Sequence, residues 1–376
     1  MAFGGTLAIS MIVLVALILR LAAVGEIFDD VRTAEGVRLR GTLYFDYPEY
    51  KLREAIRRRP QLLVLGSSTV MQWRDELFTA CTAASSCFYN AGGAMVTMHD
   101  GLEFMRSLGR EGAPRVLLIG VNFWHLDPGA DDPDHAKHVR ASFSSGPAQR
   151  AERALQVGRD VLLSAGNDPQ IRALLAGRIT VPSDVRGIAA ALHGAGFRAD
   201  GSYEYGSEES ARVSRLTPDE RAAEVIGRIA RDCCRFEHFS EPDVASVREL
   251  NELLDLAASN GTRVVAFVPP MSERVVRAIE NEPRLRDGVA RARATFAAEF
   301  AKRGIPFAQA LTTVDLGCAG TEMWDGIHPS EVCDARMLMR LMDGPARSAL
   351  EAYTTREWVS SLLSAPVSPM FLRPEP

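Results

Sequence analysis

The sequence predicts an α/β fold with a central parallel sheet of about five strands. Short apolar runs bounded by turn residues have the pattern of buried parallel strands. These runs are Leu62–Leu65, Cys87–Asn90, Val116–Val121, Thr262–Val268 and Pro306–Ala308. Helical patterns alternate with them, at Gly101–Leu108, Val244–Ser259 and Val289–Arg303. Such alternation favours parallel strands joined by right-handed crossovers.

The composition excludes several classes of protein. The chain has 376 residues, of which 47% are hydrophobic and 24% are charged. These are ordinary globular values, which argue against whole-chain disorder, collagen-like repeats and a small disulfide scaffold. The net charge of -5 provides no basic field for nucleic acid, so no nucleic-acid partner is expected.

The first residues of the chain have the pattern of a membrane anchor. Residues 1–19 carry no charged side chain, and Arg20 is followed by a further apolar stretch up to Gly25. A spanning helix needs roughly 20 apolar residues. We therefore expect a single transmembrane helix over 1–25 and a juxtamembrane segment over 26–60. A cleaved signal peptide and a buried core helix are the alternatives, but the positive n-region that a signal peptide needs is missing.

The remaining chain divides around a long insertion. About 140 residues separate the third and fourth expected strands, far more than one crossover helix requires. We interpret about 131–242 as a largely helical insertion, with a turn-rich piece at Arg198–Gly206. The main domain is expected over 61–350. A C-terminal tail, irregular at its proline-rich end, is expected over 351–376.

Six cysteines bear on the cellular compartment. In an exported protein, Cys81 with Cys87 and Cys318 with Cys333 are candidate disulfides. Scattered buried thiols are the alternative. The adjacent pair Cys233 and Cys234 receives no function.

Polar residues suited to ester chemistry follow the first, third and fifth expected strands. Ser68 comes directly after the first strand, where an amphipathic helix over Val70–Phe78 is expected to begin. Asn122 follows the third strand, and Asp325 and His328 come after the fifth. The carboxyl ends of parallel strands meet at one sheet edge, where α/β active sites form. The spacing of Asp325 and His328 allows the carboxylate to orient an imidazole whose other nitrogen faces a serine.

With these blocks, the sequence resembles the SGNH, or GDSL-like, hydrolase family. The resemblance covers Leu62–Val121 and Thr262–Leu341 but not the insertion. It implies that Ser68 is the nucleophile, with Asp325 and His328 as the orienting acid and the general base. Ser67 stands where the family usually has Asp.

The resemblance also implies an oxyanion hole. Its donors would be the backbone N–H groups of Ser68 and Gly93 and the side-chain amide of Asn122. A spacing of five residues from Asn90 would select Met95 instead of Gly93, and that alternative stays open.

The family likeness implies a three-layer, flavodoxin-like SGNH fold and an enzyme that needs no cofactor. The anchor, the insertion and the segment from Phe197 to Tyr203 resemble the membrane-anchored, extracytoplasmic group that works beside polysaccharide acyltransferases. The implied function is hydrolysis or transfer of O-acyl groups, O-acetyl above all, on a cell-surface polysaccharide, with a membrane O-acyltransferase as a partner. The alternatives are a membrane-tethered lipid or small-ester hydrolase and a non-catalytic glycan-binding or assembly subunit.

Four further residues near the motifs are candidates for lining the substrate site, namely Trp73, Arg74, Trp124 and His125. Aromatic faces suit sugar rings, although core packing is the commoner role of a tryptophan at a helix start. The acidic and histidine-containing stretch from His125 to His138 lacks helical ligand spacing, so we interpret it as a solvated loop and predict no metal site.

Overall fold

A computed structural model of the chain describes residues 12–16, 39–40, 47–81, 87–130, 163, 165–180, 185–186, 188–310 and 312–372. The chain forms two compact units, which are described separately. The smaller unit comprises Met1–Asp46, Ser144–Ala199 and Tyr203–Arg212. The larger unit comprises Tyr47–Phe143, Asp200–Ser202 and Val213–Pro376.

The larger unit is built on a five-stranded sheet with the order β3-β2-β4-β8-β9. All neighbouring strands are parallel. Counted along the chain, the order is that of doubly wound flavodoxin-like sheets. Each strand lies on one of the predicted apolar runs, so the predicted central sheet is confirmed. The strands are β2 (Leu62–Gly66), β3 (Phe88–Gly92), β4 (Val116–Gly120), β8 (Arg263–Val268) and β9 (Phe307–Gln309).

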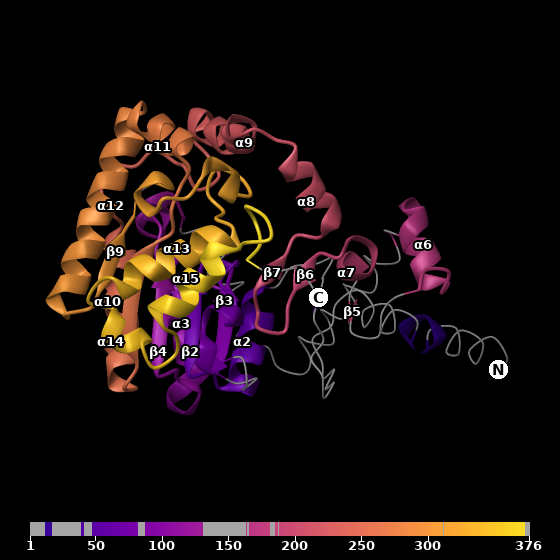
Figure 1. Cartoon of the computed structure of the whole chain (residues 1–376), viewed down its shortest axis with the longest axis horizontal. Coiled ribbons are helices and arrows are strands. Elements are labelled where there is room, and N and C mark those ends of the chain that lie inside the picture. The colour runs from indigo at the N-terminus through magenta and orange to yellow at the C-terminus, as the bar shows by residue number, and fades with distance from the viewer. Residues whose placement is uncertain are drawn as a thin grey trace, which may run out of the picture. The chain divides into compact units, whose positions relative to one another are not determined.

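Alternating strand residues contribute side chains to two hydrophobic cores on opposite faces of this sheet. Leu63 and Leu65 of β2 belong to one core, which also takes apolar side chains from α2, α3, α9, α10, α11 and α12. Leu62 and Val64 belong to the other, which α13, α14 and α15 cover. Figure 1 shows these last three helices in yellow. The larger unit therefore has helix, sheet and helix layers.

The helices of the larger unit include all three that the sequence predicts, two of them longer than expected. Side-chain caps fix several of their starts, as where Thr97 and Asp100 form a capping box at α3. The bounds are α2 (Tyr47–Arg58), α3 (Met98–Gly112), α9 (Pro218–Arg231), α10 (Val244–Ser259), α11 (Glu273–Glu280), α12 (Pro283–Lys302), α13 (Glu331–Met342), α14 (Arg347–Leu350) and α15 (Arg356–Ser364).

The prediction of a helix over Val70–Phe78 was wrong. Short 3-10 turns stand there instead, η1 (Ser68–Val70) and η2 (Asp75–Leu77). The side-chain nitrogen of Asn90 donates to the carbonyl oxygens of Val70 and Trp73, at 2.9 and 2.8 Å. These long-range bonds take backbone acceptors that a helix would have used internally.

Further 3-10 turns punctuate the loops of the larger unit. They are η3 (Thr79–Cys81), η4 (Phe123–Leu126), η5 (Pro128–Ala130), η6 (Val314–Leu316) and η7 (Gly320–Glu322). Of these, η4 follows β4 and η7 precedes the Asp325–His328 segment, so both lie beside expected site residues.

The smaller unit contains a four-stranded sheet with the order β5-β1-β6-β7. Strands β6 and β7 pair antiparallel, with Phe197 opposite Tyr203. The first part of the expected insertion, 131–162, lies outside the described residues. The described residues beyond it form helices and short strands. The elements are β1 (Leu39–Arg40), α6 (Pro169–Leu175), β5 (Val185–Arg186), α7 (Ile188–His193), β6 (Gly196–Phe197), β7 (Tyr203–Glu204) and the start of α8 (Ser207–Ser214).

Two helices extend the larger unit beyond the predicted limits of 61 and 350. Helix α2 packs on α3 within the expected juxtamembrane segment, and α15 packs on α13 within the expected tail. The proline-rich end beyond α15 is irregular as far as Leu372. Among the described helices, none has the length and apolar character needed to span a bilayer. The expected anchor 1–25 lies outside the described residues except for a helical stretch at 12–16.

Candidate active site

The residues that follow the first and third expected strands lie at the carboxyl edge of the large sheet. Strands β2 and β4 are neighbours, although β3 separates them along the chain, so the sheet order reverses between them. Open α/β sheets bind ligands at such a switch point. Ser68 follows β2 and Asn122 follows β4.

Two glycines make room for the turn that carries Ser68. A Cβ on Gly66 would lie 2.8 Å from a methyl of Val70, and one on Gly120 would lie 2.4 Å from the other. Larger residues would therefore displace Val70 and the 3-10 turn that it ends. The two strand ends can approach this turn because both lack side chains there.

Ser68, His328 and Asp325 form a hydrogen-bonded chain. Ser68 Oγ lies 2.8 Å from His328 Nε2, and His328 Nδ1 lies 2.7 Å from Asp325 Oδ2. The His328 side chain is 17% exposed, so solvent reaches the site. The sequence analysis singled out these three residues, and the structure brings their side chains together. This is the geometry required of a nucleophile, a base and an orienting acid.

The Asp325 carboxylate is held in its charged form. Its Oδ1 accepts the backbone N–H groups of Ile327 and His328, at 2.7 and 2.9 Å. Burial would raise the pKa of Asp325, but His328 and these hydrogen bonds together lower it below the usual value. A carboxylate that stays ionised can stabilise a neighbouring imidazolium.

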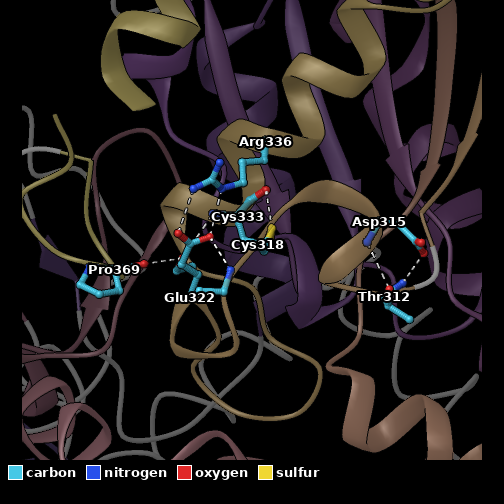
Figure 2. Close-up of a disulfide and its surroundings, with 9 residues drawn as sticks. Thr312, Asp315, Cys318, Glu322, Cys333, Arg336 and Pro369 are labelled. Atoms are coloured by element: carbon cyan, nitrogen blue, oxygen red, sulfur yellow. Dashed lines mark hydrogen bonds and ion pairs between the residues drawn. A yellow bond between two sulfur atoms is a disulfide. The ribbon is translucent and has the colours of Figure 1, made fainter. Parts of the chain in front are cut away.

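A disulfide anchors the segment that carries Asp325 and His328. Cys318 and Cys333 are bonded with their Cα atoms 5.5 Å apart, as predicted (Figure 2). The carboxylate of Glu322, between the two cysteines in sequence, accepts hydrogen bonds from Nε and Nη2 of Arg336, each at 3.1 Å. The predicted bridge from Cys81 to Cys87 is also present, whereas Cys233 and Cys234 are free thiols. The Asp–His segment is therefore tied to α13 by a covalent bond and a bidentate ion pair.

Arg221 of α9 holds the same segment from the other side. Its Nη1 donates to the carbonyl oxygens of Thr321 and Met323, at 2.8 and 2.6 Å. Arg221 is 6% exposed. No carboxylate in the described part of the chain lies within ion-pair distance of it, and burial lowers the pKa of its guanidinium. The insertion thus supplies a support for the segment that carries Asp325 and His328, which the sequence did not indicate.

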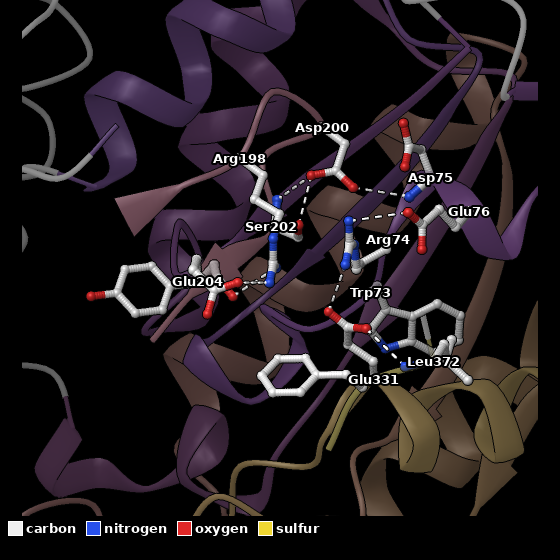
Figure 3. Close-up of polar contacts among 12 residues, drawn as sticks. Trp73, Arg74, Asp75, Glu76, Arg198, Asp200, Ser202, Glu204, Glu331 and Leu372 are labelled. Atoms are coloured by element: carbon white, nitrogen blue, oxygen red, sulfur yellow. Dashed lines mark hydrogen bonds and ion pairs between the residues drawn. The ribbon is translucent and has the colours of Figure 1, made fainter. Parts of the chain in front are cut away.

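Arg74 joins the loop after Ser68 to α13, the helix after His328, rather than lining a site as expected. Its Nη1 lies 2.9 Å from Glu331 Oε1, and its Nη2 lies 3.2 Å from Glu76 (Figure 3). Burial would lower the pKa of Arg74, but the carboxylates of Glu331, Asp200 and Glu76 raise it. Glu331 Oε2 also accepts the backbone N–H of Leu372. Arg74 is therefore a structural cation.

The other three substrate-lining predictions also fail, because these side chains are buried. Trp73 is 0% exposed and packs against Phe267, with ring centroids 5.1 Å apart. Trp124 is 3% exposed and lies against Phe123 and other core rings. His125 is 1% exposed, and its Nδ1 lies 3.1 Å from the backbone nitrogen of Asn122. The aromatic residues fill the core, and His125 supports Asn122.

Both candidates for the glycine-block donor are already engaged. The N–H groups of Gly93 and Met95 donate to the carbonyl oxygen of Gly66, at 2.9 and 3.1 Å. The prediction that Gly93 donates to an oxyanion is therefore wrong for this structure, and the Met95 alternative fails for the same reason. Within the described residues, the Ser68 N–H and the Asn122 side-chain nitrogen have no recorded acceptor, so these two predicted donors remain.

Sequence reasoning missed Asn90 and Thr69 as contributors to this site. Asn90 orders the loop after Ser68 by donating to the carbonyl oxygens of Val70 and Trp73, and Thr69 Oγ1 lies 3.1 Å from Asn122 Oδ1. Thr69 could have been noticed from the sequence, because it is a polar residue directly after Ser68. The partners of Asn90 become visible only once β2 and β3 are paired.

No cluster of three or more His, Cys, Asp or Glu side chains suited to a metal ion occurs among the described residues. Residues 131–138 of the acidic stretch lie outside them. Neither the comparison with protein-family models nor the search of curated proteins finds a match for this chain.

Proposed function

We propose that this chain is a serine-dependent ester hydrolase or acyltransferase of the SGNH type. The observation that carries the proposal is the chain of short contacts from Ser68 Oγ to His328 Nε2 and from His328 Nδ1 to Asp325 Oδ2. Its position at the switch point of a flavodoxin-like sheet supports the same reading.

In the first half-reaction, Ser68 Oγ attacks the ester carbonyl while His328 Nε2 takes the hydroxyl proton. The negative charge moves to the carbonyl oxygen, where the Ser68 N–H and the Asn122 amide nitrogen donate hydrogen bonds. Asp325 remains ionised and stabilises the imidazolium. When the tetrahedral intermediate collapses, the leaving alcohol receives the proton from His328 and the acyl group stays on Ser68.

In the second half-reaction, His328 removes a proton from the acceptor, which attacks the acyl-serine. Water as acceptor releases a carboxylic acid, and a sugar hydroxyl yields a new ester. Ser68 regains its proton from His328 in either case. The same three residues therefore serve hydrolysis and transfer.

We propose O-acyl groups, O-acetyl in particular, on a cell-surface polysaccharide as the substrate, and a membrane O-acyltransferase as the partner. The family resemblance carries this step. Two disulfides fit an enzyme that works outside the cytoplasm, because such bonds persist in oxidising compartments. The proposed tether is the apolar segment 1–25.

A nucleophile test separates an enzyme from a binding subunit. We expect wild-type protein to hydrolyse p-nitrophenyl acetate and to react with a fluorophosphonate probe at residue 68. Ser68→Ala should abolish both, because removal of the nucleophile disables the whole triad. Ser361→Ala, an exposed serine on α15, is the matched control and should change neither. Labelling at another serine, or none in folded wild-type protein, would contradict the proposal.

A further inference from the structure

Two hydroxyls that flank the nucleophile converge on the side chain of Asn122. Ser67 Oγ lies 3.2 Å from Asn122 Oδ1, and Thr69 Oγ1 lies 3.1 Å from the same atom. The two hydroxyls are themselves 3.0 Å apart. All three side chains are buried, at 6%, 1% and 2% exposure for Ser67, Thr69 and Asn122. We call the side chains of Ser67 and Thr69 the hydroxyl pair.

The chemistry of these groups sets the orientation of the amide. An amide oxygen only accepts hydrogen bonds and an amide nitrogen only donates them, whereas a hydroxyl does both. With both hydroxyl protons available to Oδ1, the oxygen is held on the side of Ser67 and Thr69. The Nδ2 group of Asn122 must then point away from the hydroxyl pair.

The backbone of Asn122 is fixed independently. Its N–H donates to His125 Nδ1, at 3.1 Å. Burial, with a contribution from Arg235, lowers the pKa of His125 to about 3, so the imidazole is neutral and can accept this bond at ordinary pH. With the backbone held, the remaining freedom at Asn122 is rotation of its side chain, which would exchange Oδ1 and Nδ2.

We propose that Ser67 and Thr69 are positioning residues that select the amide orientation in which Asn122 Nδ2 donates to the oxyanion. The inference rests on the proposed function and extends it to the two neighbours of the nucleophile. In the opposite orientation the amide oxygen would face the oxyanion and repel it. The hydroxyl pair therefore acts on the transition state through Asn122 and makes no contact with substrate.

The test is a cycle of substitutions with Asn122→Ala. Loss of one oxyanion donor costs about 10²- to 10³-fold in kcat, which is the effect expected of Asn122→Ala. We expect the double variant Ser67→Ala/Thr69→Val to lose about 10- to 100-fold in kcat with little change in KM. Each single substitution should cost less, because one hydroxyl still holds Oδ1. Ser67→Ala/Thr69→Ser keeps one hydroxyl and should recover most of the loss.

The decisive measurement is the double substitution in the Asn122→Ala background. There it should cause no further loss of kcat, because the hydroxyl pair has no amide to orient. An equal loss with and without Asn122 would mean a merely structural role and would overturn the inference. Wild-type kcat in the double variant would overturn it too. Ser68-dependent hydrolysis by wild-type protein tests the proposed function separately, so the two failures are distinguishable.

Discussion

The buried imidazole of His125 makes the stability of the fold depend on pH. Its pKa of about 3 in the folded protein lies below the ordinary value of about 6.5 in an unfolded chain. The unfolded state therefore binds a proton first as pH falls, and folding loses stability below about pH 6.5. The stability that His125 contributes is complete above that pH and declines progressively toward pH 3.

We predict that the shifted pKa of this one residue lowers the free energy of unfolding by about 2 kcal/mol between pH 7 and pH 5. His125→Asn offers an amide oxygen near the position of Nδ1, so the Asn122 N–H keeps an acceptor that does not titrate. Urea unfolding at both pH values should show a smaller acid loss in this variant, by about that amount. Identical acid losses in the two proteins would contradict the assignment of a neutral, buried His125.

At the scale of elements, the sequence predicted best what local pattern controls. The five strands were recognisable because a buried parallel strand needs an uninterrupted apolar run, as in Leu62–Leu65. Asp325 and His328 were recognisable because the acid and its imidazole lie three positions apart within one loop. The segment Val70–Phe78 was misjudged because its carbonyls bond to Asn90, which is distant in sequence. Burial of Arg74 likewise depends on Glu331, which no local pattern reveals.

Helix α9 gives the insertion a role in holding the Asp–His segment, and substitution of Arg221 tests that role. Arg221→Met removes hydrogen bonds to the carbonyl oxygens of Leu216, Thr321 and Met323, so we expect a loss of about 1–3 kcal/mol in unfolding free energy and a lower kcat. Arg277→Met, at an exposed position on α11, breaks only a surface pair with Glu273 and should cost less than about 1 kcal/mol. Thermal unfolding and ester hydrolysis compare the two variants. Equal effects would show that α9 does not support the Asp–His segment.

At the scale of the whole molecule, the two disulfides differ in what they constrain. The bond from Cys81 to Cys87 spans 6 residues near the end of η3, whereas that from Cys318 to Cys333 spans 15 residues and encloses Asp325 and His328. In the chain-entropy model, closing loops of these sizes stabilises the fold by about 2 and about 3 kcal/mol. Thermodynamically the two bonds are therefore similar, but only the second encloses residues of the proposed catalytic triad.

That difference predicts separable effects on stability and on activity. Replacing Cys81 and Cys87 by alanine should lower the free energy of unfolding but leave kcat near wild type in the folded protein. Replacing Cys318 and Cys333 should lower both, since His328 must stay within hydrogen-bond reach of Ser68. Urea unfolding and steady-state ester hydrolysis, measured well below each variant's melting temperature, separate the two quantities. If the variant that lacks Cys318 and Cys333 keeps full kcat, then Arg221, Glu322 and α13 hold the segment without the covalent bond, and the disulfide serves stability alone.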